Sequence, residues 1–468
     1  MVLVAGAFLG GLSLLGGCRR PIAPDVLLVT LDTVRADHTT PGGSERDTTP
    51  RLARLAQDGV IFSAAYAPMP MTAPSHAAVF SGRYPINLGV TTNGVELPRN
   101  GPWLPEQLLH AGYETAGFVS SFVVGRQFGW ARGFERFDDR FVPEYASVVS
   151  PVWEGFEVPN SALDQRATVT TDKVLEWIAQ RDQSGRPFFV WVHYFDPHTP
   201  YDPPEGFEGA FSSREESAES ELQRHVRRYD EEILYTDHEL GRLLDGLTRH
   251  RQGRDLLLVV LGDHGESFLE HGHVHHGLTV YEEAVRVPLL FHWPGRVAPA
   301  RLTEPAGLVD VAPTLLGMLG VTSNASEGPA IDGHDLSSIL LGRAGPQGGQ
   351  HGLLLQRRSF AAGATDELFD PPWAKRKRGD VIVGEQFGWV LDGWKYIECR
   401  ETGRRELYAL TMDPKEREDV SERDNELALV LGRQLRRFVD QRRAGDAATT
   451  KPIAEEERAR LRALGYLP

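Results

Sequence analysis

The sequence predicts an α/β fold in which a large, mostly parallel β-sheet carries helices on both faces. Four apolar runs of strand length are continuous rather than alternating, which is typical of strands buried on both faces of a parallel sheet. Segments with a helical pattern separate these runs, and such alternation is typical of an α/β domain. The expected strands are Pro24–Asp32, Glu114–Ser120, Pro187–His193 and Asp255–Leu261.

The expected helices lie between these strands and are Thr49–Asp58, Leu104–Ala111, Ala167–Arg181 and Tyr229–Arg251. A region rich in Gly, Ser and Pro, from about 322 to 349, loosens the pattern, and a second unit follows it. That unit has strand-like segments at Gly388–Ile397 and Glu406–Pro414 and an amphipathic helix near Ala428–Arg443. We therefore expect a signal segment over 1–18, a linker over 19–24, a main domain over 25–345, a linker or loop over 346–379 and a small C-terminal α+β subdomain over 380–468.

The first 18 residues form an apolar run that is too short for a comfortable membrane span. Its end, Leu15-Gly-Gly-Cys18, looks like a bacterial lipobox, which would be cleaved before Cys18 and lipidated on it. The alternatives are a plain secretory signal or a misassigned start, because no Lys or Arg precedes the run. We expect a protein of the bacterial cell envelope, periplasmic or anchored at the outer membrane as a lipoprotein, that touches the membrane only through this lipid.

Composition narrows the choice of partners. The net charge of −15 argues against a nucleic-acid partner, but a bound metal would reverse the sign locally and admit a small anionic substrate. Only Cys18 and Cys399 are present, so Cys399 is expected to be unpaired and disulfides to play no part in the fold.

The most informative stretch runs from Met71 to Pro85. It places the Thr72 hydroxyl on a tight turn directly before a short helix, and Pro74 and Ser75 suit the first turn and the N-cap. Free N–H groups at a helix N-terminus favour an anion such as sulfate or phosphate.

Two other polar groups follow apolar strands. Asp32 ends the first strand, and Asp263 and His264 end the strand that precedes Gly265-Glu266. Ligands bind beyond the carboxyl ends of strands in open α/β sheets, so these residues and Thr72 are candidates for one metal site.

The stretch from Met71 to Pro85 closely resembles the active-site signature of the sulfatase family, within the alkaline phosphatase superfamily. Thr72 stands where that family has its formylglycine precursor, and His76 stands where it has an Arg. Neither cysteine lies near Thr72, so a formylglycine derived from cysteine is excluded. The resemblance spans roughly residues 25 to 420 and implies the family's large mixed, mostly parallel sheet. The residues that it keeps are Pro74, Ala77, Gly82, Arg83, Tyr84 and Pro85.

The resemblance implies a divalent metal held by Asp32, Thr72, Asp263 and His264. Sulfatases bind Ca²⁺ through oxygen alone, whereas the imidazole here suits zinc or manganese better. Phosphoethanolamine and lipoteichoic-acid transferases have a similar single-metal set, and nucleotide pyrophosphatases have a similar set on one of two zincs. One ion is favoured, and the alternative is a second ion held by Asp196, His198 and His276.

Three histidines match catalytic positions of the family. His198 lies in Asp196-Pro-His198, which resembles the "His-x-Pro" loop that contacts ester oxygens, and His271 and His276 match a His and a Lys that precede "Thr-x-Tyr-Glu". At position 276 the change from Lys to His removes a fixed positive charge. For His76 two alternatives stay open, a hydrogen bond near Thr72 or a position facing solvent.

We expect a metal-dependent hydrolase of sulfate or phosphate esters, in which the metal activates the Thr72 nucleophile and a covalent intermediate forms, with phosphoester chemistry favoured. The substrate would be an anionic ester in a small molecule, a glycan or a lipid head group, and specificity would lie in loops such as Val142–Leu163 and Pro203–Glu219. The alternatives are an envelope phosphoethanolamine- or glycerophosphate-type transferase and a non-catalytic anion-binding relative. Such transferases usually carry several membrane spans.

Overall fold

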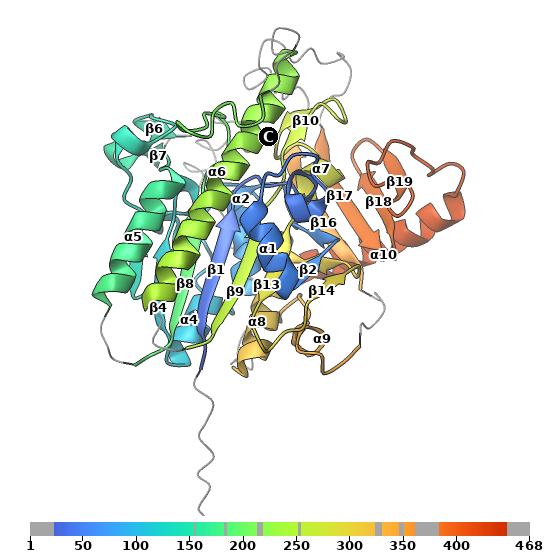
Figure 1. Ribbon diagram of the computed structural model, residues 1–468. Coiled ribbons are helices and arrows are strands. Elements are labelled where there is room, and N and C mark those ends of the chain that lie inside the picture. The colour runs from blue at the N-terminus through green and yellow to red at the C-terminus, as the bar shows by residue number, and fades with distance from the viewer. Residues whose placement is uncertain are drawn as a thin grey trace, which may run out of the picture.

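The computed structural model describes residues 23–153, 156–181, 185–212, 219–250, 254–322, 330–345, 351–360 and 383–446. Its centre is an eight-stranded sheet (Figure 1). The strands lie in the order β14 (Ala300–Leu302), β2 (Val60–Phe62), β13 (Leu289–His292), β9 (Leu256–Gly262), β1 (Asp25–Leu31), β8 (Phe188–Tyr194), β4 (Glu114–Phe118) and β5 (Arg136–Asp138). The expected signal segment over 1–18 and most of the following linker lie outside the described residues.

The predicted mixed, mostly parallel sheet is confirmed. β1 is parallel to both β8 and β9, and β4 is parallel to both β8 and β5. β13 is antiparallel to its neighbours β9 and β2, which makes the sheet mixed. All four expected strands are present as β1, β4, β8 and β9, with ends that differ by one or two residues.

Helices cover both faces of the sheet because side chains of each strand point alternately to either side. Val26 and Leu28 of β1 lie in one hydrophobic core, and Leu27 and Val29 lie in another. The first core includes residues of α2 (Thr72–Ser81), α4 (Leu104–His110) and α8 (Val311–Leu319). The second includes residues of α1 (Pro50–Asp58), α5 (Ala167–Gln180) and α6 (Glu221–His250).

Helix α6 begins at Glu221, not at Tyr229 as expected. Leu222 and Val226 pack against the second core, so the helical stripe continues through a segment whose many charged residues hide it in the sequence. As a result α6 rises past the carboxyl edge of the sheet, above the arrowhead of β1 (Figure 1).

A four-stranded antiparallel sheet forms the C-terminal unit, in the order β16 (Leu353–Phe360), β17 (Gly384–Leu391), β18 (Trp394–Cys399) and β19 (Arg405–Ala409). The expected linker over 346–379 is therefore wrong at β16, which pairs with β17 and begins the subdomain before residue 380. The turn between β17 and β18 is Asp392-Gly393, both at positive φ, which suits a tight hairpin.

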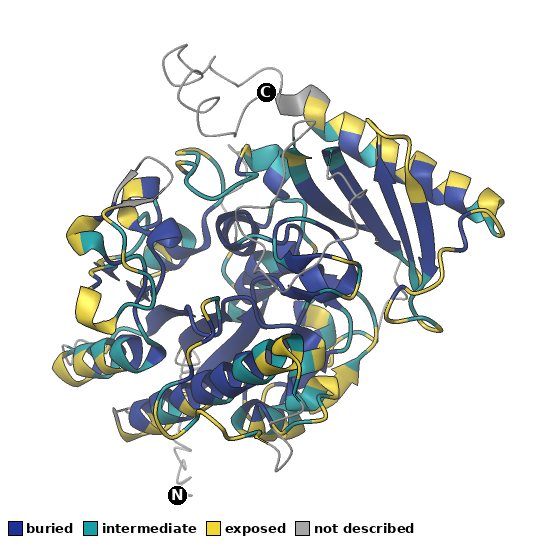
Figure 2. Cartoon of the chain, turned by 90° about the horizontal axis from the view of Figure 1, so that it is seen from above, coloured by how far each residue is buried: buried dark blue, intermediate teal, exposed yellow. Residues whose placement is uncertain are grey.

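The C-terminal sheet is covered on both faces. Helix α10 (Asn425–Asp446) packs on one face through Leu431, Leu435 and Val439 and leaves its outer side exposed (Figure 2). The other face packs on the main domain, where Ile397 and Tyr408 share a core with Val280 and Tyr281. This contact places the C-terminal unit beside the segment that follows β9.

Shorter elements complete the described chain: β3 (Ala65–Tyr66), α3 (Pro85–Leu88), β6 (Val152–Trp153), β7 (Phe156–Glu157), β10 (Ser267–Phe268), β11 (Val274–His275), α7 (Glu282–Val285), β12 (Arg286–Val287), β15 (Ala306–Gly307) and α9 (Ser337–Leu340). Among the described residues, the helices lack a segment long and apolar enough to cross a membrane. Cys399 is buried as a free thiol.

Candidate active site

Three neighbouring strands bring carboxylates and imidazoles to one edge of the sheet. Asp32 directly follows β1, Asp263 directly follows β9, and His193 lies near the end of β8. The backbone ties these strand ends together, since the N–H of Asp32 donates to the carbonyl of Tyr194 at 3.0 Å and that of Asp263 to the carbonyl of Leu31 at 3.2 Å. Asp32 and Asp263 therefore lie close together at this carboxyl edge.

Helix α2 presents Thr72 to the same edge. The helix begins at Thr72 after an extended Met71, and all its residues are buried. The expected N-cap at Ser75 is wrong, because the N–H of Ser75 already donates to the Met71 carbonyl at 3.1 Å and its hydroxyl donates to the Met69 carbonyl at 3.0 Å. Thr72 therefore occupies the first turn itself, where the helix dipole favours negative charge.

His264 lies at the centre of the cluster. Its Nε2 is 3.3 Å from Oγ1 of Thr72, 3.7 Å from Oδ1 of Asp32 and 3.6 Å from Oδ2 of Asp263. Nδ1 of the same ring is 3.0 Å from the carbonyl oxygen of Gly265, which can only accept, so Nδ1 carries the proton. The lone pair of Nε2 therefore faces Thr72 and the two carboxylates. Burial lowers the pKa of His264 well below its usual value and keeps the ring neutral.

The two carboxylates have too few donors for their burial. Oδ1 of Asp263 accepts from the N–H groups of Thr33 and His264 at 3.1 and 2.8 Å, but Oδ2 of Asp263 and both oxygens of Asp32 have no hydrogen-bond partner among the described residues. Burial raises the pKa of Asp32 to about 8, and burial and the charge of Asp32 raise the pKa of Asp263 well above its usual value. A buried, charged carboxylate that lacks hydrogen-bond donors destabilises the fold unless a cation neutralises its charge.

The donor set fits a divalent metal ion. One ligand atom from each of Asp32, Asp263 and His264 lies within 4.8 Å of the others, and the Thr72 hydroxyl adjoins them. A set of oxygen donors with one imidazole suits zinc or manganese better than calcium.

His76 is buried and binds the backbone beside Thr72, which decides between the two alternatives left open by the sequence. Its Nδ1 lies 2.8 Å from the Thr72 carbonyl oxygen, and its Nε2 lies 2.9 Å from Oγ1 of Thr30. Burial lowers the pKa of His76 well below its usual value, so the ring supplies no positive charge. His76 also lies 3.5 Å from Asp263, but both its nitrogens are already engaged, which makes it a poor metal ligand.

His193 was not assigned a role from the sequence, and the structure places it in the cluster. The residue is fully buried, its Nε2 lies 3.4 Å from Oδ2 of Asp32, and neither ring nitrogen has a hydrogen-bond partner among the described residues. Burial lowers its pKa to about 3. Its position at the end of an apolar strand, like that of Asp32, is the signal that could have identified it.

His276 and His198 border the cluster on its less buried side. The ring of His276 is centred 4.6 Å from that of His264 and 5.0 Å from that of His198. Glu266, for which the sequence analysis predicts no role, lies 3.3 Å from Nδ1 of His276 through one oxygen and accepts from the Tyr201 hydroxyl at 2.9 Å through the other. The structure thus brings two of the three expected catalytic histidines to the site.

The third, His271, does not join them. Its Nδ1 is 2.8 Å from Oε1 of Glu283, its Nε2 is 3.0 Å from the Glu416 carbonyl oxygen, and its ring stacks on Tyr281. Assigning His271 a catalytic role from the family pattern was therefore a mistake, because both nitrogens are committed to contacts between α7 and the C-terminal unit.

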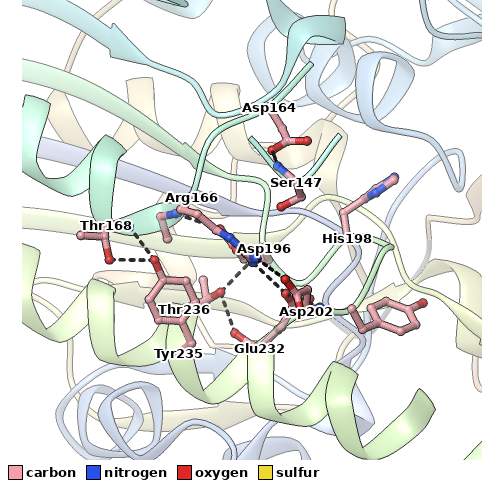
Figure 3. Close-up of polar contacts among 12 residues, drawn as sticks. Ser147, Asp164, Arg166, Thr168, Asp196, His198, Asp202, Glu232, Tyr235 and Thr236 are labelled. Carbon is pink, nitrogen blue, oxygen red and sulfur yellow. Dashed lines mark hydrogen bonds and ion pairs between the residues drawn. The ribbon is translucent and has the colours of Figure 1, made fainter. Parts of the chain in front are cut away.

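Asp196 is likewise committed elsewhere. Its carboxylate accepts from Nη1 of Arg166 at 2.9 Å and from the N–H of Ala167 at 2.8 Å, at the start of α5. Figure 3 shows Asp196 within a network with Arg166 and Glu232, while the ring of His198 points away from it. The alternative second ion on Asp196, His198 and His276 therefore has no preformed ligand set.

A protein-family model described as Sulfatase matches residues 24–321, which is more than half of the chain. Among curated proteins, the choline-sulfatase of Rhizobium meliloti (strain 1021) is 25% identical over 370 residues, covering 68% of this chain and 72% of the relative. Arylsulfatase G of Rattus norvegicus is 26% identical over 430 residues, covering 77% of this chain and 78% of the relative.

Solved structures show the same fold. The phosphonate monoester hydrolase of Agrobacterium radiobacter superposes with a TM-score of 0.69 at 19% sequence identity, covering 90% of this chain and 96% of the other. A sulfatase of Bacteroides fragilis described as putative superposes with a TM-score of 0.71 at 20% identity, covering 92% and 98%.

Proposed function

Because the chain belongs to the sulfatase family, we propose that it is a metal-dependent hydrolase of anionic esters that uses the Thr72 hydroxyl as its nucleophile and prefers phosphate esters to sulfate esters. Its substrate would be an ester in a small molecule, a glycan or a lipid head group. The observation that carries the proposal is the contact of Thr72 Oγ1 with His264 Nε2, at 3.3 Å, beside two buried and uncompensated carboxylates.

Asp32, Thr72, Asp263 and His264 would hold the ion, consistent with the divalent metal that the family generally binds. When bound, a divalent ion lowers the pKa of a hydroxyl and neutralises the charge of an anionic ester. We favour zinc or manganese because of the imidazole of His264, and one ion because the carboxylate of Asp196 is already used by Arg166 and α5.

A plain hydroxyl nucleophile is supported by what surrounds position 72. Of the two cysteines in the chain, Cys399 is buried in β18 and Cys18 lies in the N-terminal segment, so neither can supply an aldehyde at this site. His76 occupies the position of the family's Arg, but its ring is neutral and forms a hydrogen bond with the backbone carbonyl of Thr72. Thr72 is thus oriented by a neutral ring at this position.

The preference for phosphate follows from the same loss of fixed positive charge. The positions that sulfatases fill with Arg and Lys carry His76 and His276; burial lowers the pKa of His76, while His276 contacts the carboxylate of Glu266. A phosphate monoester carries more negative charge than a sulfate ester, so it gains more than the sulfate ester does from a divalent ion that takes the place of side-chain cations.

The reaction would proceed in two displacements. Oγ1 of Thr72 loses its proton to solvent and forms a bond to phosphorus while the bond from phosphorus to the leaving oxygen breaks, and that oxygen takes a proton from His276. Water then attacks the phosphorus and gives one proton to His276, the bond from phosphorus to Oγ1 breaks, and Oγ1 regains a proton from solvent as phosphate is released. His276 adjoins both His264 and Glu266, which suits it to hold that proton.

A paired assay tests the proposal on the full chain. Turnover of aryl phosphate, aryl phosphodiester and aryl sulfate is measured with added zinc, manganese or calcium, for the wild type and for Thr72→Ala, Thr72→Ser and Ser81→Ala. Ser81 lies in the same helix, and its hydroxyl donates to the Ala77 carbonyl and accepts from the N–H of Arg83, so its variant controls for damage to α2. We expect phosphoester turnover that Thr72→Ala abolishes, Thr72→Ser partly keeps and Ser81→Ala leaves intact.

Two results would contradict this expectation. Turnover of the sulfate ester alone would contradict the proposed preference for phosphate. Turnover that survives Thr72→Ala would exclude Thr72 as the nucleophile. Acid quenching and mass spectrometry add a direct readout, since a covalent intermediate adds the mass of a phosphoryl group to the peptide that contains Thr72.

We also propose that the protein is anchored to the cell envelope through Cys18, which lies outside the described residues. The support is the lipobox-like run that ends at Cys18. Metabolic labelling with a fatty acid and membrane fractionation of wild type and Cys18→Ser test it. A Cys18→Ser protein that keeps both the label and the membrane association would overturn the anchor.

A further inference from the structure

A pocket of about 360 Å³ lies beside the candidate active site and has no part in the chemistry described so far. Its walls are the loop after His198 and the first two turns of α6. The lining residues are Thr199, Pro200, Tyr201, Glu221, Arg224, His225 and Arg228.

The loop that forms one wall of the pocket also contacts residues of the candidate active site. Nδ1 of His198 donates to the carbonyl of Thr199 at 2.7 Å, so the pocket loop fixes one of the histidines that border the cluster. Tyr201 reaches the site from the same loop, because its hydroxyl donates to Glu266, which contacts His276. The pocket and the candidate site therefore share this loop, through His198 on one side and Tyr201 on the other.

The pocket is basic, and one of its cations is not neutralised by any residue that the structure describes. Each guanidinium nitrogen of Arg228 donates a hydrogen bond: to the Tyr201 carbonyl at 2.8 Å, to Asp202 at 2.9 Å and to Glu208 at 3.3 Å. Arg227, one residue earlier, is paired with Glu219 and Glu231. The guanidinium of Arg224, by contrast, has neither a hydrogen bond nor an ion pair with any described residue, and it is exposed.

An unpaired arginine in a pocket is a donor for a carboxylate, sulfate or phosphate, which its planar fork binds through two hydrogen bonds. This cation stands out in a protein whose net charge is −15. Among the described residues of the lining, Glu221 alone is acidic, and it would repel the same anion.

From this arrangement we propose that Arg224 binds a second anionic group of the substrate, separate from the ester that Thr72 attacks. The substrate class would then be an ester that carries at least one further carboxylate, sulfate or phosphate. This inference rests on the proposed function for the identity of the ester, but the pocket can be tested without turnover.

Binding is measured by calorimetry in the Thr72→Ala background, where the ester is not consumed. The probes are phenyl phosphate and aryl phosphates that bear a carboxylate or a sulfonate at increasing distances from the phosphate. We expect Arg224→Gln to weaken binding of the best doubly substituted probe roughly tenfold and to leave phenyl phosphate unchanged. Arg224→Lys should restore part of the loss, and Glu221→Gln should tighten binding of the same probe.

The matched control is Arg249→Gln, an exposed arginine near the other end of α6, which should change neither affinity. A loss that is equal for phenyl phosphate and the doubly substituted probes, or no loss for any of them, would overturn the proposal. Tight binding that depends on Arg224 together with no turnover by the wild type would leave this inference standing and would refute the hydrolase. The distance and the anion that bind best identify whether the second group is a carboxylate or an oxyanion of sulfur.

Discussion

Oγ1 of Thr72 lies 3.3 Å from Nε2 of His264, although the two residues are 192 positions apart in the sequence. The contact exists because the first turn of α2 meets the carboxyl end of β9, where Asp263 and His264 leave the sheet. It joins a hydroxyl, an imidazole and two carboxylates in a space that is almost fully buried. The chemistry proposed for this protein depends on that meeting.

Asp263→Asn should separate metal binding from folding. In the wild type, zinc or manganese at about 100 times its dissociation constant should stabilise the fold by about 3 kcal/mol, and this gain should be lost in the variant. In chelator the variant should be at least as stable as the wild type, because one of two facing buried carboxylates is removed. Thermal melts with chelator and with each metal measure both effects.

Asp310→Asn is the matched control for this variant. Asp310 is also buried, but it accepts from the backbone of Gly307 and His334 and has no contact with the candidate site in the described chain. Its variant should lose stability and keep the full metal-induced gain. A normal metal response in Asp263→Asn would show that the ion binds elsewhere.

The pH dependence of stability should report the His271–Glu283 pair. Burial lowers the pKa of His271, but the hydrogen bond and charge of Glu283 outweigh it and bring the pKa from 6.5 to about 9. A histidine whose pKa rises on folding stabilises the protein below its unfolded pKa, and this contribution is lost as the pH rises through the folded pKa. The free energy of unfolding should therefore fall between pH 6.5 and pH 9, by about 1 to 2 kcal/mol from this pair after allowance for solvent screening.

Urea unfolding at several pH values in this range, for wild type, His271→Gln and His110→Gln, measures the effect. His110 is exposed at the end of α4, so its variant should keep the wild-type slope. The His271→Gln variant should have a flatter profile, and an unchanged slope in that variant would contradict the assignment. Turnover at neutral pH should survive His271→Gln if the residue has a structural role only.

Lys395→Met should destabilise the junction between the C-terminal sheet and α7. Lys395 is fully buried, and its Nζ lies 3.2 Å from Glu282 and 2.9 Å from Glu416. Removing its charge leaves two buried carboxylates without a cation, so the free energy of unfolding should fall by about 3 to 5 kcal/mol. The exposed Lys415→Met should cost less than about 0.5 kcal/mol in the same urea titration. Equal losses for the two variants would mean that the buried ion triad does not hold the units together.

The continuous apolar runs predicted β1, β4, β8 and β9 within two residues, because a strand buried on both faces must be apolar along its whole length. The pattern failed where charge masks amphipathicity, as at the start of α6, and where a strand follows a linker, as at β16. At the site, the strand-end rule identified Asp32, Asp263 and His264. His193 obeys the same rule, but its place at a strand end did not by itself indicate a role, which follows from its contact with Asp32.

The sequence by itself determined the fold class, the family and the four residues expected to hold a metal, because these depend on local patterns and on a short motif. Only the tertiary structure decided which histidines can act. His76, His193, His198, His271 and His276 are alike as residues, and each one's role depends on what its two nitrogens touch. Those partners come from distant segments, such as Glu283 and Glu416 for His271, and contacts across such distances are set by how the sheet and its helices pack. The same holds for Arg224, which the start of α6 at Glu221 places in the wall of a pocket, without a side-chain partner among the described residues.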